Sequence, residues 1–168
     1  MERSNSIFFI IFLIVAVSIV FQLKFGNVTG YGYDVVLATL IVASLFLNFF
    51  ELLVFILLGI FFLNWQPGIS IEMISFLIMP MLFLWGRRVF PGKAWLGSVG
   101  FLSLGIFLFY LIVDFIPMFY FAVDYGDFTS SMWQVLGSFV GNFIFGVLFG
   151  ALVFYILGYF YGKKEYGW

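Results

Sequence analysis

The chain has 168 residues, a formal net charge of −1, and neither cysteine nor histidine. These absences exclude disulfides, thiolate zinc sites, haem ligation by imidazole and catalysis by Cys or His. The near-zero net charge gives no reason to expect nucleic-acid binding. Hydrophobic residues make up 65% of the chain and charged residues 9%, against about a quarter charged in soluble domains. The composition predicts a single-domain, all-α polytopic membrane protein with no cofactor.

The first apolar run, residues 7–23, is close to the roughly 20 residues that a membrane-spanning helix needs. Arg3 precedes it, as a basic residue does in a signal peptide. No small-residue cleavage site follows, since the run ends in Phe21-Gln22-Leu23-Lys24. We therefore expect an uncleaved helix, then a glycine-containing loop up to Asp34, which occupies a helix N-cap position.

The apolar stretch from Asp34 to Leu63 is long for one span and short for two. One tilted helix would place Asn48 and Glu51 near mid-membrane, where a charge costs about 2.5–3.5 kcal/mol. Two short helices would place both residues at an interface. Asn48 and Glu51 have the spacing of a capping box, which favours helices over 34–47 and 49–63.

The next predicted helix covers 70–86, with Ser70 as its N-cap, Glu72 in its first turn and a kink at Pro80. A basic loop follows, containing Arg87, Arg88 and Lys93. A clear span over 94–116 ends at a proline, and an aromatic and acidic connection leads to the last helix. We expect that helix over 132–161, since Ser131 and Gln134 form a second capping-box pattern.

The basic residues predict the topology in an inner membrane. With six helices, all of them except Lys24 share one side; with five helices, Lys24 joins that side and Arg3 leaves it. Both counts place the 87–93 loop and the C-terminus in the cytoplasm and the 117–131 connection outside. The helix count and the side of the N-terminus remain open at this stage.

Asp114 is the acidic residue that lies well inside a predicted span. It could form an ion or proton site, or contact a polar group of a partner. It could equally be an interfacial carboxylate that water or Tyr110 satisfies. Glu51 has the same two interpretations, as a site or as a helix-start charge. No nucleophile–base pair can be assembled, so we expect no enzymatic activity.

The last predicted helix contains two Gly-x-x-x-Gly spacings, Gly137/Gly141 and Gly146/Gly150. At about 100° per residue the two pairs fall on opposite faces. One face could pack inside the bundle and the other against a partner helix, or both could be internal. Asn142, between the pairs, is a candidate for an interhelical hydrogen bond.

Two loops are further interaction candidates. Arg87, Arg88 and Lys93 could contact lipid phosphates as a cytoplasmic anchor or bind a cytoplasmic partner. The 117–131 connection carries Tyr125 among other aromatic residues and two aspartates. Exposed aromatic surface of this kind meets either protein or the outer leaflet, and both interpretations remain open.

The segment from Leu58-Gly59 to Pro67-Gly68 and the helix after it carry a resemblance. Two short apolar runs, a Pro-Gly turn and a further helix closing on basic residues resemble the MreD family of rod shape-determining membrane proteins. Many members have an acidic residue just before the turn, where this chain has Asn64. The resemblance implies about six helices and a non-enzymatic scaffold in a cell-shape or peptidoglycan-elongation complex, with an MreC-like membrane protein and membrane lipids as partners.

The same family is similar to the substrate-binding S-components of energy-coupling factor transporters, which gives the alternative function. That alternative implies capture of a vitamin-like molecule and docking on a transport module. S-components usually have an Ala-x-x-x-Ala pattern in the first helix, whereas here Ala16 is followed by Val20. A third class, an intramembrane enzyme acting on lipid, would need Asp114 or Glu51 as its acid or base.

Overall fold

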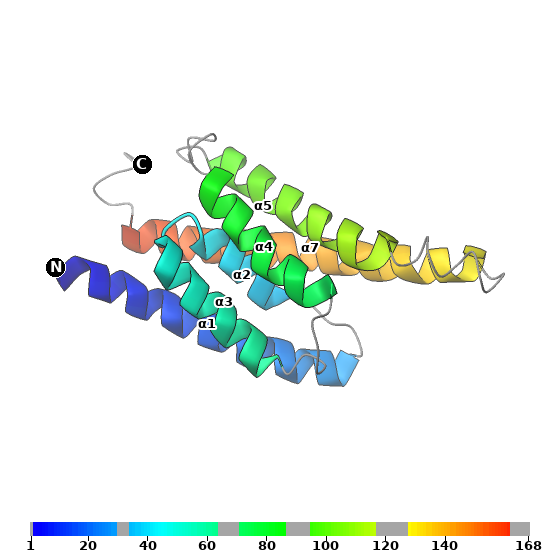
Figure 1. Cartoon of the computed structure of the whole chain (residues 1–168), viewed down its shortest axis with the longest axis horizontal. Helices are drawn as coiled ribbons and strands as arrows, with labels where there is room; N and C mark the ends of the chain where they lie inside the picture. The colour runs from blue at the N-terminus through cyan, green and yellow to red at the C-terminus, as the bar shows by residue number, and fades with distance from the viewer. Residues whose placement is uncertain (1, 30–33, 64–70, 87–94, 117–127, 162–168) are drawn as a thin grey trace.

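The computed structural model describes residues 2–29, 34–63, 71–86, 95–116 and 128–161, and every regular element in these ranges is a helix (Figure 1). The prediction of an all-α bundle is therefore confirmed for this part of the chain. Its elements in chain order are α1 (Glu2–Thr29), α2 (Val35–Ala43), α3 (Phe49–Phe62), α4 (Ile71–Gly86), α5 (Trp95–Tyr110), the π-helical turn η1 (Leu111–Phe115) that continues α5, and α7 (Phe128–Tyr161).

The stretch from Asp34 to Leu63 forms two helices, as the capping-box pattern predicted. The backbone N–H of Asn48 donates to Oε2 of Glu51 over 2.9 Å, and α3 begins at the next residue. Helix α2 ends at Ala43 rather than at residue 47. The chain tightens there, because the N–H groups of Leu45 and Phe46 bond carbonyls three residues back.

Two other helices are longer than predicted. Helix α1 runs from Glu2 to Thr29, beyond the expected 7–23, and α7 begins at Phe128 rather than at residue 132. The predicted capping box at Ser131 and Gln134 therefore lies inside α7. Helical hydrogen bonding continues through polar residues, so the apolar run marks only part of each helix. Helix α4 contains Pro80 and continues to Gly86, and Ser70 lies outside the described residues.

Helix α2 is the centre of the bundle. All nine of its residues are buried, and it contacts α1, α3, α4, α5 and α7. Figure 1 shows it between α1 on one side and α5 on the other. The largest fully buried side chains around it come from four helices and the turn after α2: Ile11, Val15, Leu47, Leu52, Phe55, Ile56, Phe76, Leu102 and Ile106.

Helix α2 runs in the same direction as α7 and opposite to α1 and α5 (Figure 1). Just after α2, the ring of Phe46 lies 6.0 Å from that of Phe154 on α7. On the α5 side, Ile41 packs against Gly105. These contacts fix which residues of neighbouring helices lie at the same height in the bundle.

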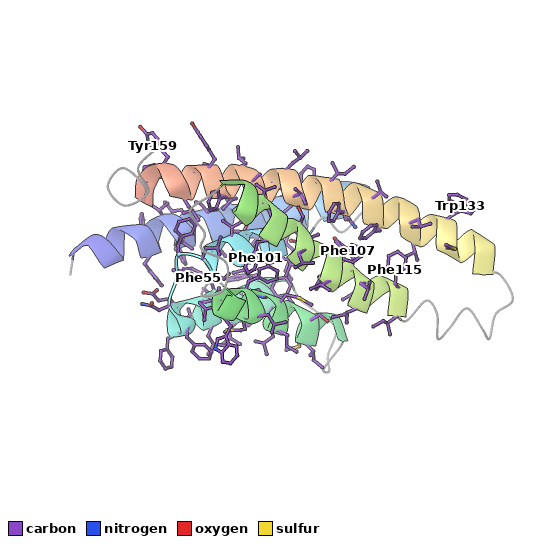
Figure 2. The ribbon with its side chains drawn as sticks, turned by 90° about the horizontal axis from the view of Figure 1, so that it is seen from above. Phe55, Phe101, Phe107, Phe115, Trp133 and Tyr159 are labelled. Carbon is purple, nitrogen blue, oxygen red and sulfur yellow. The ribbon has the colours of Figure 1, made fainter. Side chains whose placement is uncertain are left out.

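The outer surface of the bundle is apolar. Leu148, Leu152 and Tyr155 on α7 are each more than half exposed, and Figure 2 shows Trp133 and Tyr159 on the side of α7 that faces away from the other helices. Within the described residues, one helical stretch, Val135–Phe160, is long and apolar enough to cross a membrane. Four apolar stretches are shorter: Phe8–Lys24, Phe49–Phe62, Met73–Gly86 and Val99–Val113.

Candidate functional site

Polar side chains meet inside the bundle where α1 and α2 pack together. The hydroxyls of Ser18 and Thr39 lie 2.8 Å apart and are both buried. Each oxygen also lies 2.8 Å from a carbonyl of its own helix, Ser18 from that of Ile14 and Thr39 from that of Val35. Each hydroxyl has one proton to donate, so the hydroxyl that donates across the interface leaves its own carbonyl, while the other accepts there and donates to its carbonyl. This is the kind of interhelical hydrogen bond that an apolar interface uses.

One turn above this pair, Gln22 of α1 supplies the N-terminal cap of α2. Its Oε1 accepts the backbone N–H of Val36 over 3.0 Å. Asp34 occupies the N-cap position by its backbone, but its carboxylate makes no capping hydrogen bond to α2. Asp34 is thus the N-cap residue of α2, as predicted, but Gln22, from another helix, bonds the N–H group that a capping side chain would bond.

Two neutral side chains of the described residues contact the carboxylate of Asp34. Tyr110 donates its hydroxyl to Oδ2 over 2.6 Å, and Gln22 Nε2 lies 3.4 Å from Oδ1. These contacts join α1, α2 and α5, and the carboxylate is half-buried. Tyr110 is itself buried and is the last residue of α5 before the π-helical turn. Single π-helical turns are frequent at functional sites.

Aromatic packing fixes the ring of Tyr110. Its centroid lies 5.9 Å from that of Phe139 on α7, in an edge-to-face arrangement. Phe139 also contacts Phe107 and Phe115, which flank Tyr110 along α5 and η1. The hydroxyl that reaches Asp34 is thus carried by a ring that α7 holds from the other side.

Asn142 is the polar residue that α7 contributes at this height. Gly150 packs on Leu102 and Gly146 on Ile106, so a further step of four residues along both antiparallel helices brings Asn142 opposite Tyr110. The contact between Phe46 and Phe154 agrees with this placement, because the two chain segments run in the same direction. Asp34 precedes Phe46 by as many residues as Asn142 precedes Phe154, so Asp34 and Asn142 lie at a similar height. Asn142 is 7% exposed, and its buried Oδ1 has no hydrogen-bond partner.

The four predicted helix-packing glycines divide into two pairs. A Cβ at Gly146 would lie 3.1 Å from Ile106, and one at Gly150 would overlap with Leu102, so this pair packs inside the bundle. A Cβ at Gly137 or Gly141 would meet nothing within 4 Å. This pair lies on an exposed face of α7.

Of the remaining predicted site residues, Glu51 lies away from the polar cluster. Glu51 sits at the start of α3 in its capping box. The backbone of Asp114 lies in η1, while its side chain is outside the described part of the structure. The basic anchor residues Arg87, Arg88 and Lys93, and Tyr125 of the aromatic connection, also lie outside the described residues.

Sequence reasoning missed the cluster of Gln22, Asp34 and Tyr110. In the sequence, Asp34 follows a glycine-containing loop and so resembles a local helix cap, and Tyr110 is one turn before Asp114 and so resembles its neighbour. The available signal was polar spacing: Ser18 and Gln22 are one turn apart on an otherwise apolar face of α1, and such residues face other helices rather than lipid.

Comparison of the chain with known protein families, with curated proteins and with solved structures finds no match.

Proposed function

We propose that this chain is an integral inner-membrane protein whose helices form a polytopic bundle and whose role is to bind another membrane protein. The apolar exterior supports the membrane assignment. Large hydrophobic side chains are exposed on α1, α3, α4, α5 and α7, and a water-soluble bundle of this size would not expose apolar surface on every outer helix. Helices shorter than about 20 residues fit a bilayer when neighbours cover them or the bilayer thins locally.

The proposed topology has an even number of helices, with both termini in the cytoplasm. Six helices place every basic residue except Lys24 on the side of the 87–93 loop, which satisfies the positive-inside rule. In this arrangement Arg87, Arg88 and Lys93 anchor the cytoplasmic face against lipid phosphates, and the 117–131 connection is outside.

The observation that carries the partner-binding role is the open face of α7 at Gly137 and Gly141. Both glycines are exposed and neither would bring a Cβ within 4 Å of another residue. A small-x-x-x-small pair lets a second helix approach closely in lipid, where van der Waals packing drives association. The other pair, Gly146 and Gly150, lies on the opposite face of α7 and packs against α5 inside the bundle.

The specific version of this proposal is an MreD-like scaffold in a cell-shape or peptidoglycan-elongation complex, with an MreC-like membrane protein as the partner. It rests on the resemblance of the segment from Leu58 to the basic residues after α4. The role is non-enzymatic, since it requires binding surfaces and no chemistry.

The test is a mild-detergent pull-down of the tagged full-length protein from its native membrane, with mass spectrometry of proteins and small molecules. We expect a stoichiometric membrane protein to be retained, and Gly137→Leu with Gly141→Leu to reduce its recovery at least about tenfold. Gly100→Leu on α5 is the matched control, because a Cβ at Gly100 also meets nothing within 4 Å. Equal recovery with both sets of variants would refute the α7 interface.

A second function, the substrate-binding component of a transporter, is favoured by one observation. The cluster of Gln22, Asp34 and Tyr110 places polar groups inside the bundle, where such residues commonly mark a ligand or ion pathway. The pull-down distinguishes the two functions, since a transport component would retain a small molecule and an ATP-hydrolysing module.

A further inference from the structure

We propose that the outer side of α3 and α4 is a lipid-binding surface beside which the bilayer is thinned, and that it prefers lipids with short acyl chains. This surface is called the short face below. Its exposed side chains are Phe50, Val54, Leu57 and Phe61 on α3 and Ile74, Ile78, Leu82 and Trp85 on α4. The inference rests on the proposed membrane location. It concerns the side of the bundle opposite to α7 (Figure 2).

The short face consists of two apolar stripes. The exposed residues of α3 follow each other at steps of four, three and four positions, and those of α4 at steps of four, four and three. Such steps place side chains on one side of a helix. Helices α3 and α4 pack against each other, and both stripes contain only hydrophobic side chains. The stripes therefore present one continuous kind of surface, which suits acyl chains.

The short face is shorter than a bilayer core is thick. Helix α3 has 14 residues, which span about 21 Å, whereas the hydrocarbon core measures about 30 Å. The apolar part of α4, Met73–Gly86, is no longer than α3, and both helices run obliquely to α7 (Figure 1). The apolar stretch of α7 has 26 residues, or about 39 Å. The molecule thus presents a long side and a short side to the same bilayer.

The contacts of Phe55 show at which end α3 is too short. Helices α1 and α3 run in the same direction (Figure 1), and the ring of Phe55 lies 5.0 Å from that of Phe8 and 6.4 Å from that of Phe12. Equal steps along both helices bring Phe62, where α3 ends, to the level of about residue 17 of α1. The apolar part of α1 continues to Lys24. Helix α3 therefore ends about 10 Å before the apolar surface of its neighbour does.

The other end of α3 has a polar boundary that prevents a compensating shift. The backbone N–H of Asn48 donates to the carboxylate of Glu51 over 2.9 Å in an exposed contact. Moving α3 deeper would bring this carboxylate into the hydrocarbon region, where a charge is costly. Helix α3 also contains no lysine or arginine that could extend to the headgroups from below them. Thinning of the bilayer is the remaining way to cover the short face with lipid.

Lipid fits the short face better than a partner helix does, because its side chains are large. Helices associate in membranes through small residues, and none of the described residues exposed on α3 and α4 is small. Gly59 of α3 and Gly86 of α4 both face other helices of the bundle. Phe50, Phe61 and Trp85 are each more than three quarters exposed. This is the reverse of α7, where an exposed pair of glycines leaves room for a helix.

The experiment uses the absence of cysteine from the chain. Leu57→Cys on the short face and Leu148→Cys on α7 are each labelled with a small fluorophore in the full-length protein, at leucines that are 53% and 65% exposed. The protein is reconstituted in vesicles of brominated phosphatidylcholine with chains of about 18 carbons, which quenches the label on contact. Unbrominated phosphatidylcholine with chains of about 14 or about 22 carbons is then added as a competitor. The wild-type chain, which has no labelling site, gives the background.

We expect the 14-carbon lipid to displace the brominated lipid from the label at position 57 at least about threefold more effectively than from the label at position 148. The 22-carbon lipid should show the opposite order. Val54→Cys and Leu152→Cys, which are also exposed, provide a second pair if either leucine variant does not fold. The same chain-length preference on both helices would overturn the proposal.

Two further outcomes separate this inference from the proposed membrane location. Quenching on α7 without quenching on α3 would mean that protein, such as a second copy of the chain, covers the short face, and it would also overturn the proposal. The absence of quenching at every labelled position would refute the membrane location itself, and the lipid surface with it.

Discussion

Helices α2 and α7 run parallel in the same bundle and are both almost wholly apolar, yet their surroundings are opposite. Helix α2 has nine residues and all are buried, whereas α7 has 34 residues and exposes many of its large side chains. The difference follows position in the bundle rather than hydrophobicity. Helix α2 reads Val-Val-Leu-Ala-Thr-Leu-Ile-Val-Ala without an aromatic residue, so five helices can approach it closely. On α7, by contrast, Phe154 is buried while Ile144 and Leu148 are exposed, because one side of this helix faces away from the bundle.

The largest expected effect comes from adding one methyl group beside α2. A Cβ at Gly105 would lie 2.7 Å from the ring of Phe83 and 3.1 Å from Ile41. We expect Gly105→Ala to lower the free energy of unfolding by about 3 kcal/mol, since a rigid buried ring cannot move aside cheaply. Equilibrium unfolding in mixed detergent micelles measures this quantity.

Gly100→Ala is the matched control, because Gly100 lies on the same helix and a Cβ there meets nothing within 4 Å. This variant gains helix propensity without a clash, so its stability stays equal or rises by up to about 1 kcal/mol. Similar losses in both variants would contradict the close packing around α2.

A smaller effect is expected from removing matched leucine side chains from the two helices. Leu40 of α2 is fully buried and Leu148 of α7 is 65% exposed. Leu40→Ala leaves a cavity and costs about 2 kcal/mol, near the low end of the usual range because lipid is as apolar as the protein core. Leu148→Ala changes a surface contact and leaves the same unfolding measurement within about 0.5 kcal/mol. A larger loss of unfolding free energy for Leu148→Ala than for Leu40→Ala would contradict the burial of Leu40 and the exposure of Leu148.

The elements that the sequence predicted best are those fixed by local interactions. The start of α3 follows from Asn48 and Glu51, which lie three residues apart and bond each other. The start of α7 was predicted from a similar pattern at Ser131 and Gln134, but the helix begins at Phe128. A capping pattern marks a helix start only where the chain before it is not already helical.

The cluster of Gln22, Asp34 and Tyr110 could not be predicted in the same way, because its members belong to α1, the start of α2 and α5. Gln22 and Asp34 are 12 positions apart along the chain and Asp34 and Tyr110 are 76 apart, so no local pattern relates them. Even the pairing of Gly146 and Gly150 with α5 shows this limit: the sequence places the two glycine pairs on opposite faces, while only the packed helices show which face is internal.

The smallest predicted effect concerns the polar pair that joins α2 to α1. Ser18→Ala and Thr39→Val each remove one hydroxyl from the buried 2.8 Å contact. A double-mutant cycle on unfolding stability is expected to give a coupling of about 0.6 kcal/mol, typical of interhelical hydrogen bonds in membrane proteins. The coupling is small because a hydroxyl that loses its partner across the interface can donate to a carbonyl of its own helix instead.

Ser103 provides the control for this cycle, since its hydroxyl donates to the carbonyl of Val99 within α5. Ser103→Ala combined with Thr39→Val should be additive, as expected for residues without a shared partner. A coupling near zero between Ser18 and Thr39 would mean that packing alone holds α2 against α1. The stabilising polar contact between α1 and α2 would then be the one a turn further along α1, where Gln22 accepts the N–H of Val36 at the start of α2.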